Sequence, residues 1–249
     1  MKEYFIKKIK LQGPISVSEY MAENNLAPNI GYYDKGKKIG KKGDFITSPE
    51  ISQVFGELIG LFMTDYWNLN NKPKKSILVD LGGGNGTMMK DCLRAISKVS
   101  NIYINSLKPI FIETSSEMSI KQKISIPNSI IYKDFNKIPN TYMGLIANEF
   151  FDALPIKQYI KVNNNWHERL VDIDPKNDQN LRFVYDKNPS KHINFLPNIS
   201  PEFKILETCP SADNLINEIT NKIINFGGVA LIIDYALQKK RLLWVIPSY

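Results

Sequence analysis

The strongest chemical signal in the chain is a glycine-rich segment, Asp80-Leu81-Gly82-Gly83-Gly84-Asn85-Gly86-Thr87. It follows the short apolar run 76–81 and precedes residues 87–96, whose apolar spacing predicts a helix. Glycines let a backbone turn tightly and approach a ligand closely, and the first turn of a helix presents free N–H groups to an anion. The segment therefore predicts a ligand-binding loop between a buried strand and a helix.

The spacing of the glycines separates two classes of ligand. A dinucleotide fingerprint places a third glycine or alanine at position 87, and Thr87 stands there instead, which disfavours a nicotinamide dehydrogenase. The observed order, Asp80 followed by Gly82, Gly84 and Gly86, resembles motif I of Rossmann-like S-adenosylmethionine methyltransferases. That resemblance implies a loop around the methionine and ribose part of the cofactor. A glycine-rich turn without a ligand is the plain structural alternative.

Two acids follow the next predicted strands, 109–113 and 129–133. Glu113 ends the first of them, where a carboxylate beside a glycine loop can accept hydrogen bonds from both hydroxyls of a ribose. A solvated loop acid is the alternative for Glu113. Asp134 follows the second strand, and we assign it to the adenine amino group. Both acids are expected near the loop, because ligands of parallel sheets bind outside the carboxyl ends of the strands.

A third group of polar residues, within Asn148–Asp152, follows the predicted strand 142–147. Methyl transfer depends mainly on positioning, and a carboxylate can orient and deprotonate the acceptor. Glu149 and Asp152 are the candidates for this role, and Asn148 is assigned to the cofactor. A guanidinium acceptor would suit paired carboxylates, because its planar fork matches them. Surface acids that cap a turn are the alternative.

The elements that must position these residues change in character along the chain. Strands and helices alternate over residues 76–154, which predicts a parallel sheet in an α/β fold. Residues 157–185 alternate apolar with polar side chains between Asn-rich turns, which predicts inserted antiparallel hairpins. A helix that Ser211 is expected to cap and that Gly227-Gly228 ends, followed by a fifth buried strand over 229–234, returns to the α/β pattern.

The N-terminal part is expected to be helical. The pattern of residues 1–13 predicts a helix, and residues 28–44, which are rich in Gly and Lys, are expected to form a loop. A further helix is expected to begin near Ser48, either capped by Ser48 itself or by a capping box of Thr47 with Glu50. Its predicted buried face consists of apolar residues at helical spacing: Ile51, Phe55, Leu58, Ile59 and Phe62.

Composition excludes several classes of protein. The 249 residues are 43% hydrophobic and 23% charged, so a disordered or fibrous chain is excluded. Two cysteines and two histidines cannot build a disulfide scaffold or a Cys/His metal cluster. Cys92 is expected to be a small core residue, and His167 a packed or surface residue and not a catalytic base. No apolar run approaches the roughly 18 residues of a membrane span.

The net charge of +7 permits an acidic partner. The lysines are scattered and lack an aromatic stacking pattern, so nucleic acid is only a minor alternative. The first residues lack the apolar region of a secretory signal. We therefore expect a soluble protein of a reducing compartment: bacterial cytoplasm, or the mitochondrial matrix if the source is eukaryotic.

Six segments, in order, carry a family resemblance. They are GPISVSEYM (13–21), GYY (31–33), GDFITSPEISQVFGELIG (43–60), DLGGGNGTMMKDCLR (80–94), NEFFDALPIKQ (148–158) and LIIDYA (231–236). In these the chain resembles the MidA-like methyltransferases, the family of the mitochondrial complex I assembly arginine methyltransferase. The GDFITSPEIS block is the most specific of the six, and the resemblance runs from about Lys8 to Tyr235.

The resemblance implies a class I methyltransferase fold that uses S-adenosylmethionine as cofactor. It also implies a protein substrate, an arginine in a complex I core subunit or its bacterial counterpart, and an assembly role. We expect one methyltransferase domain over 1–249 with four parts. They are an N-terminal helical cap with the signature loop (1–70), a cofactor-binding half (76–154), a β-hairpin insert (155–205), and the last helix and the fifth strand, truncated (206–249).

The resemblance further assigns the signature segment to the site. Asp44, Thr47, Ser48, Pro49 and Glu50 match it and are expected to lie over the cofactor and the acceptor. Glu50 is therefore a third candidate catalytic residue. Without the resemblance, this stretch would predict only a capped amphipathic helix.

Relatives in this family usually continue well past the fifth strand. We expect the final antiparallel strands to be missing here, which would leave 229–234 at an apolar edge. A non-catalytic or truncated cofactor-binding assembly factor is therefore the alternative to an active enzyme.

Overall fold

The computed structural model describes residues 1–26, 48–191 and 205–235. The predicted loop 28–44, including Asp44, and Thr47 lie outside the described residues, as does everything after Tyr235. Contacts divide the described chain into two compact units: one of residues 1–26, 153–191 and 205–214, the other of 48–152 and 215–235. The single methyltransferase domain over 1–249 stays a prediction.

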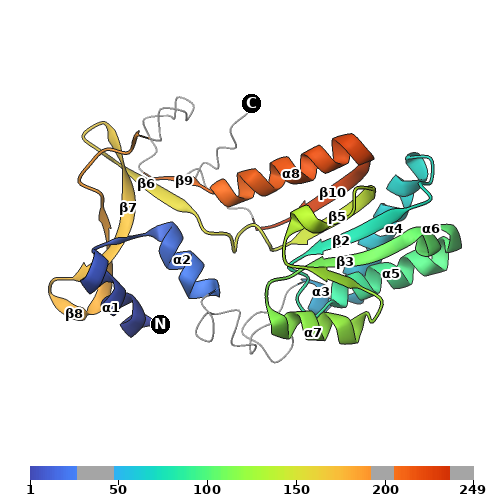
Figure 1. Cartoon of the computed structure of the whole chain (residues 1–249), viewed down its shortest axis with the longest axis horizontal. Helices are drawn as coiled ribbons and strands as arrows, with labels where there is room; N and C mark the ends of the chain where they lie inside the picture. The colour runs from blue at the N-terminus through green and yellow to red at the C-terminus, as the bar shows by residue number, and fades with distance from the viewer. Residues whose placement is uncertain (27–47, 192–204, 236–249) are drawn as a thin grey trace. The chain divides into compact units, whose positions relative to one another are not determined.

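The second unit is built on a five-stranded parallel sheet of order β10-β5-β2-β3-β4 (Figure 1). The bounds of its strands are β2 Ser76–Leu81, β3 Leu107–Ile112, β4 Ile130–Tyr132, β5 Tyr142–Asn148 and β10 Gly228–Ile233. All four pairings are parallel, as the alternating pattern predicts. β10 lies at one edge of the sheet that the described residues form. The α/β fold is confirmed.

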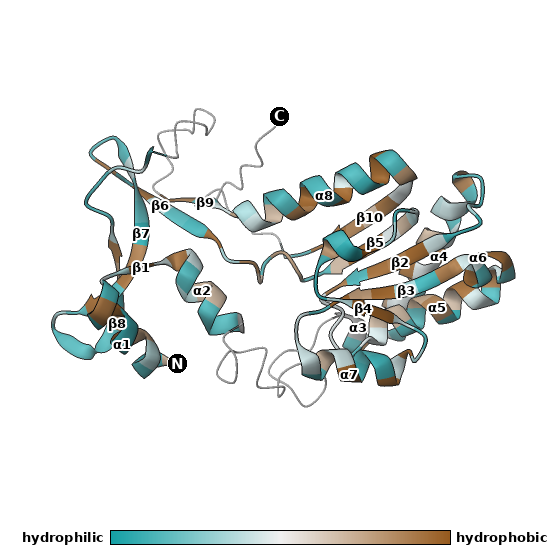
Figure 2. Cartoon of the chain, in the orientation of Figure 1, coloured by the Kyte–Doolittle hydropathy of each residue, from teal (hydrophilic) through white to brown (hydrophobic). Residues whose placement is uncertain are grey.

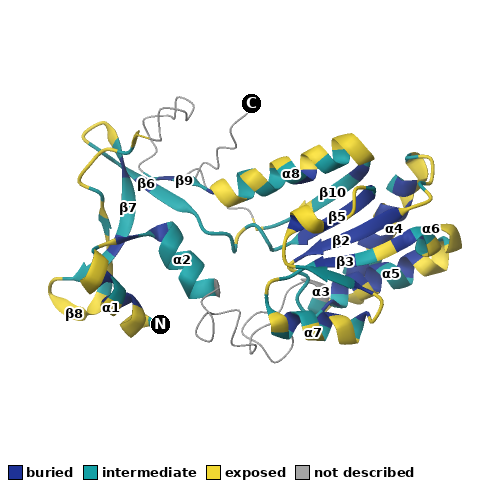
Figure 3. Ribbon diagram, viewed as in Figure 1, coloured by how far each residue is buried: buried dark blue, intermediate teal, exposed yellow. Residues whose placement is uncertain are grey.

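Side chains of the central strand β2 are buried on both faces, so helices cover both sides of the sheet (Figures 1 and 3). One core contains Leu78 with residues of α4, α5 and α6, and the other contains Val79 with residues of α8. The helices of this unit are α3 Ser48–Ile51, α4 Gln53–Leu69, α5 Thr87–Val99, α6 Asn101–Ser106, α7 Ser116–Ser125, the 3₁₀ turn η1 Phe135–Lys137, and most of α8 Pro210–Phe226. β2 and β5 are hydrophobic along most of their length, whereas hydrophilic and hydrophobic residues alternate along α8 (Figure 2).

The predicted buried face of the helix after Ser48 is partly wrong. The helix is interrupted at Ser52, which is extended, and α4 begins at Gln53. Leu58 is 60% exposed and Phe62 41%, whereas Ile59 is buried. The reason is close packing against α5: a Cβ on Gly60 would lie 2.6 Å from the Cys92 carbonyl oxygen. Glycine, and not the largest apolar side chain, therefore decides which face of α4 is buried.

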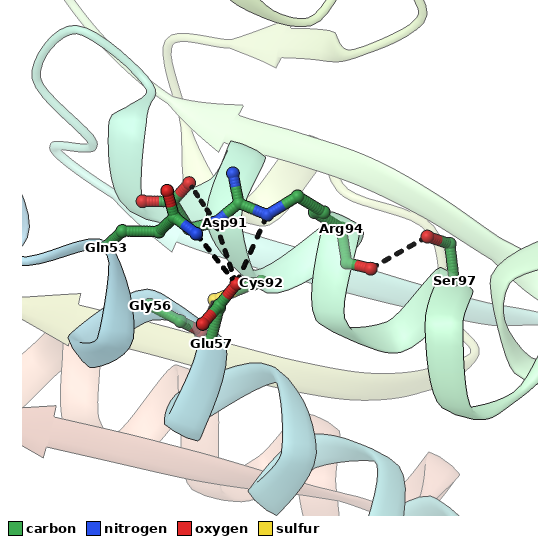
Figure 4. A network of polar contacts seen from close by, with 7 residues as sticks. All are labelled: Gln53, Gly56, Glu57, Asp91, Cys92, Arg94 and Ser97. Carbon is green, nitrogen blue, oxygen red and sulfur yellow. Dashed lines mark hydrogen bonds and ion pairs between the residues drawn. The ribbon is translucent and has the colours of Figure 1, made fainter.

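Polar contacts also join α4 to α5 (Figure 4). The Arg94 guanidinium lies 3.0 Å from Glu57 of α4 and 2.9 Å from Asp91 of its own helix. The Cys92 thiol donates to the Gly56 carbonyl oxygen at 3.1 Å and is fully buried, as predicted for a core residue. These contacts fix the helix whose N-terminus carries the glycine-rich loop.

The first unit is an antiparallel sheet of order β1-β7-β6-β9, with β8 paired to β7. Its elements are β1 Ile15–Ser16, β6 Lys157–Val162, β7 Asn165–Asp174, β8 Asn177–Tyr185, β9 Ile205–Thr208, and helices α1 Lys2–Gln12 and α2 Val17–Leu26. The predicted hairpins are confirmed. β1 pairs with β7 across more than 150 residues of sequence, Ile15 opposite Val171, so the N-terminal helices group with the hairpins. His167 is buried, with Nδ1 2.7 Å from the Asp186 carbonyl oxygen.

Among the described residues, no helix combines the length and the hydropathy that crossing a bilayer requires. The same residues bring no three His, Cys, Asp or Glu side chains together in a geometry that could hold a metal ion.

Candidate functional site

The glycine-rich loop leaves β2 at Leu81 and enters α5 at Thr87. Gly82, Gly84 and Gly86 have φ angles of 63°, 51° and 80°. This left-handed region is disfavoured for residues that carry a Cβ atom. The alternating glycines of the sequence are thus the three positions at which the backbone needs them.

The loop also folds tightly over the end of β2. A Cβ on Gly83 would lie 2.6 Å from Asp80 Oδ2 and 2.7 Å from Phe111 Cε1. Real Cβ atoms do not approach buried atoms so closely, so only glycine fits this position. The loop therefore has two separate requirements for glycine, one for conformation and one for space.

Asp80 lies beneath the loop with 0% of its surface exposed. Neither of its carboxylate oxygens has a hydrogen-bond partner among the described residues. Burial, and then the nearby charge of Glu113, raises the pKa of Asp80 from 3.8 to about 8. A buried polar group without a partner is rare in folded proteins and is typical of functional sites.

Glu113 follows β3, and its backbone N–H donates to the Tyr132 carbonyl oxygen at 2.9 Å. Oε1 of its carboxylate accepts from the Ser115 N–H at 2.8 Å, and Oε2 accepts from Gln122 Nε2 at 3.2 Å. Gln122 Nε2 also donates to the Gly84 carbonyl oxygen at 3.0 Å. Burial raises the pKa of Glu113, and these hydrogen bonds oppose the shift. The structure therefore brings Glu113 to the glycine loop.

Asp134 lies beyond β4 and is exposed. Its carboxylate accepts from the Asn136 N–H at 3.0 Å and caps the turn η1. This capping contact explains its position without any ligand. The adenine role of Asp134 remains a prediction.

Glu50 of α3 contacts the loop directly. Its Oε1 accepts from Thr87 Oγ1 at 2.9 Å and from Asn85 Nδ2 at 3.3 Å. The contact joins the signature segment to the N-terminus of α5. In this arrangement Glu50 holds the loop, and a catalytic role for it remains a prediction.

The end of β5 forms a second, different part of the site. Asn148 is the last residue of β5, and Glu149 follows with a φ of 51°. This left-handed conformation is uncommon for residues other than Gly, Asn and Asp, and such strain clusters at functional sites. The Glu149 N–H donates to the Ile233 carbonyl oxygen of β10 at 2.8 Å, which holds the turn in place.

Three carboxylates gather at this turn. The Asp152 N–H donates to Asp234 Oδ2 at 3.1 Å, and Tyr235 Oη donates to Glu149 Oε1 at 3.2 Å. Burial raises the pKa of Glu149, and the charges of Asp152 and Asp234 add to the shift, while Tyr235 opposes it. The arrangement can accept N–H donors from a cation and can take up a proton.

Sequence reasoning missed three of these residues as parts of the site. Asp234 and Tyr235 lie in the LIIDYA segment, so the family resemblance contained a signal for them. Gln122 gave no signal, because a single glutamine in a polar helix is ordinary. Only the fold shows that it joins Gly84 to Glu113.

Comparison with known proteins decides the family. Residues 58–243 match a family model described as "Putative S-adenosyl-L-methionine-dependent methyltransferase". The chain belongs to this family. The match covers the glycine loop, Glu113, the turn after β5 and β10.

Named relatives share much of the sequence. The chain is 38% identical over 258 residues to "Protein arginine methyltransferase NDUFAF7, mitochondrial" of Xenopus laevis, an alignment that covers 93% of this chain and 59% of the relative. It is 34% identical to the Homo sapiens protein of the same name, over 94% of this chain and 59% of that protein. The chain thus spans about three fifths of the length of these relatives.

Solved structures show the same fold. A crystal structure of a Burkholderia thailandensis protein bound to S-adenosyl-homocysteine superposes with a TM-score of 0.74 at 20% identity, over 95% of this chain and 62% of that one. A native crystal structure from the same organism gives 0.73 at 21% identity, over 96% and 61%. At these identities the likeness concerns the fold alone.

Proposed function

We propose that this chain is an S-adenosylmethionine-dependent methyltransferase that modifies a protein arginine. The observation that carries the proposal is the glycine loop, which Gln122 joins to Glu113 above the unpartnered carboxylate of Asp80. Family membership supports the same reading. The relatives named as protein arginine methyltransferases support arginine as the acceptor.

The residues at the loop fit the cofactor. The left-handed glycines leave the backbone free of side chains, and Asp80 holds two buried oxygens that still need a donor or a positive charge. The bound cofactor supplies an electrophilic methyl group on a positively charged sulfonium. Glu113 would hold the ribose hydroxyls, and we keep Asp134 for the adenine and Asn148 as a further cofactor-binding residue.

The acceptor would bind at the turn after β5. Glu149 and Asp152 would accept N–H groups of a guanidinium, which aligns one nitrogen for in-line attack. Glu149 would take the proton that this nitrogen loses. Its raised pKa makes it a better base than an ordinary surface carboxylate. Asp234 would add to the negative charge that attracts the cation.

The relatives support a proposal for the partner and the compartment. We propose a protein substrate, with a complex I core subunit or its bacterial counterpart as the first candidate because of the family resemblance. The curated relatives carry the word mitochondrial in their names. A reducing compartment, either the mitochondrial matrix or bacterial cytoplasm, is the matching proposal for this chain.

Calorimetric titration with S-adenosylmethionine tests the cofactor site. We expect micromolar-range binding by the parent and a loss of more than about a hundredfold in Gly84→Val, because a β-branched side chain is strained at a φ of 51°. Gly13→Val is the matched control: Gly13 also has a positive φ, 87°, but lies in the other unit with nothing near its Cβ position. A folded parent that does not bind would overturn the proposal.

Methyl transfer to an arginine-containing peptide of the candidate complex I subunit tests the reaction itself. Labelled methyl groups should appear on arginine with the parent and not with Gly84→Val. Cofactor binding without transfer to any arginine substrate would instead favour the alternative, a cofactor-binding assembly factor.

A further inference from the structure

Gln122 is a completely buried polar residue that the reading of the sequence did not assign. It lies on α7, away from the glycine loop in sequence, with 0% of its surface exposed. Its Nε2 lies 3.0 Å from the Gly84 carbonyl oxygen and 3.2 Å from Glu113 Oε2. One side-chain amide thus contacts the loop and the candidate ribose acid together.

The chemistry of its two partners fixes the orientation of the amide. A carbonyl oxygen and a carboxylate oxygen both accept hydrogen bonds, so only the NH₂ group of Gln122 can face them. Both N–H bonds are then used. The remaining Oε1 is buried and has no partner among the described residues. An unpaired buried oxygen costs stability and is uncommon, which makes Gln122 a candidate for a functional role.

The hydrogen bonds at Glu113 leave part of the acceptor capacity of its carboxylate free. Each carboxylate oxygen can accept about two hydrogen bonds. The Ser115 N–H occupies one position on Oε1, and Gln122 occupies one on Oε2. The Thr114 N–H also donates to this carboxylate. About one acceptor position therefore stays open, and a hydroxyl of a vicinal diol can donate to it.

We propose that Gln122 is a positioning residue for the cofactor's ribose. By holding Glu113 Oε2 and the Gly84 carbonyl oxygen at a fixed separation, it sets the orientation of the diol relative to the glycine loop. The residue acts through Glu113 and need not touch the reacting atoms. This inference rests on the proposed cofactor.

The test compares two ligands: S-adenosylhomocysteine, and its 2′,3′-dideoxy analogue, which lacks the diol. Gln122→Met keeps the length of the side chain and removes both donors. We expect it to weaken S-adenosylhomocysteine binding about tenfold, the usual size for a lost hydrogen bond to a charged group, and to leave the analogue unchanged. The matched control is Gln179→Met, an exposed glutamine of β8, which should change neither affinity.

A double-mutant cycle identifies the route of the effect. If Gln122 acts through Glu113, Gln122→Met should lose most of its effect in the Glu113→Gln background. Equal weakening of both ligands, or an undiminished effect without the Glu113 carboxylate, would show a merely structural role and overturn the inference. Gln122→Asn is the second variant if Gln122→Met does not fold. It keeps the amide but is one methylene shorter, and it should show the same diol-dependent loss.

The outcomes separate this inference from the proposed function. If the folded parent binds neither ligand, the cofactor proposal itself fails. If the parent binds and Gln122→Met binds S-adenosylhomocysteine equally well, only the role of Gln122 fails.

Discussion

The glycine loop and the turn after β5 lie at the same end of the parallel sheet but are built differently. At the loop, Asp80 and Gln122 are fully buried, and the Glu113 carboxylate accepts hydrogen bonds from Ser115 and Gln122, among others. At the turn, Asp152 is exposed and Tyr235 is 75% exposed. The polar groups beneath the loop are thus buried, although Gly82 of the loop itself is exposed, whereas the groups at the turn are open to solvent. We call the loop with its buried groups the enclosed region and the turn after β5 the open region.

This difference suits the two partners of the proposed reaction. A small cofactor can be held by backbone and buried groups that are in place before it binds. A protein side chain must instead reach its carboxylates from solvent, which an enclosed pocket would prevent. The comparison therefore predicts that changes at the loop affect ligand affinity and stability, whereas changes at the turn affect turnover.

Replacement of Glu149 should show the largest effect. Glu149→Gln removes the proposed proton acceptor and keeps its size, so we expect turnover to fall by about 10² to 10⁴, the usual contribution of a general base. Affinity for S-adenosylhomocysteine should stay within about twofold of the parent. Labelled-methyl assays and calorimetry measure the two quantities.

Glu117→Gln is the matched control for this change, because Glu117 pairs with Lys121 on the surface of α7. It should leave both turnover and affinity unchanged. Loss of cofactor affinity in Glu149→Gln, with turnover at saturating cofactor preserved, would remove the distinction between the two regions.

A methyl group at Gly83 should break the enclosed region. Its Cβ would meet Asp80 Oδ2 at 2.6 Å and Phe111 at 2.7 Å. We expect Gly83→Ala to lower the free energy of unfolding by about 1–3 kcal/mol, the usual cost of overpacking. S-adenosylhomocysteine affinity should fall as well, and denaturant unfolding with calorimetry measures both.

Gly13→Ala separates crowding from backbone strain. Gly13 has a φ of 87° and no atom within 4 Å of its Cβ position, so this control measures strain alone and should leave ligand affinity intact. Unchanged affinity in Gly83→Ala would show that the loop tolerates movement and is not preorganised.

The sequence predicted the enclosed region better than the open one, for physical reasons. Left-handed backbone at Gly82, Gly84 and Gly86 requires glycine, so the requirement is visible in the sequence. The contact of Tyr235 with Glu149 joins residues 86 apart and depends on β10 pairing with β5. No local pattern reports such a contact, although the family resemblance included its residues.

Helix packing was also hard to predict. Apolar spacing assigned Leu58 to the buried face of α4. In the structure Gly60 packs closely against Cys92 of α5, and Leu58 is exposed. Similarly, the pairing of Ile15 with Val171 gave no local signal. Strands such as Ser76–Leu81 were predictable because their burial on both faces produces a continuous apolar run.

The charge of Asp80 should make stability depend on pH. Its folded pKa of about 8 exceeds the ordinary 3.8, so the folded state binds more protons than the unfolded state between these values. Stability from this group is therefore complete below pH 3.8 and is lost as the pH rises through 8. An asparagine at position 80 cannot ionise, so Asp80→Asn should not lose stability in this way as the pH rises. The Tm of Asp80→Asn should therefore exceed that of the ligand-free parent by at least about 2 °C near pH 8 and by less near pH 5.

The same change should weaken S-adenosylmethionine binding, because the positive sulfonium would lose a buried partner. Thermal melts across pH 5 to 9, with and without ligand, measure both effects. Asp65→Asn, an exposed residue of α4, is the control and should show neither. A Tm difference that does not change with pH would contradict a buried carboxylate that titrates near pH 8.

The smallest effect is expected at Tyr235. Its hydroxyl donates to Glu149 Oε1 at 3.2 Å and lowers the pKa of that carboxyl. Tyr235→Phe removes the donor, so the pKa of Glu149 should rise and the acidic limb of the rate–pH profile should move to higher pH. Because the contact is exposed, turnover at low pH should fall only about two- to fivefold, with little change above the limb.

Tyr185→Phe, a half-exposed tyrosine in the other unit, is the matched control and should leave the profile unchanged. A shift of the acidic limb to lower pH in Tyr235→Phe would mean that the hydroxyl does not stabilise the ionised carboxylate. A shift of the acidic limb to higher pH, with unchanged cofactor affinity, would assign the open turn to proton transfer and the enclosed loop to cofactor binding. The reason is that only a residue coupled to the base can change the pH dependence of the rate without changing the cofactor affinity.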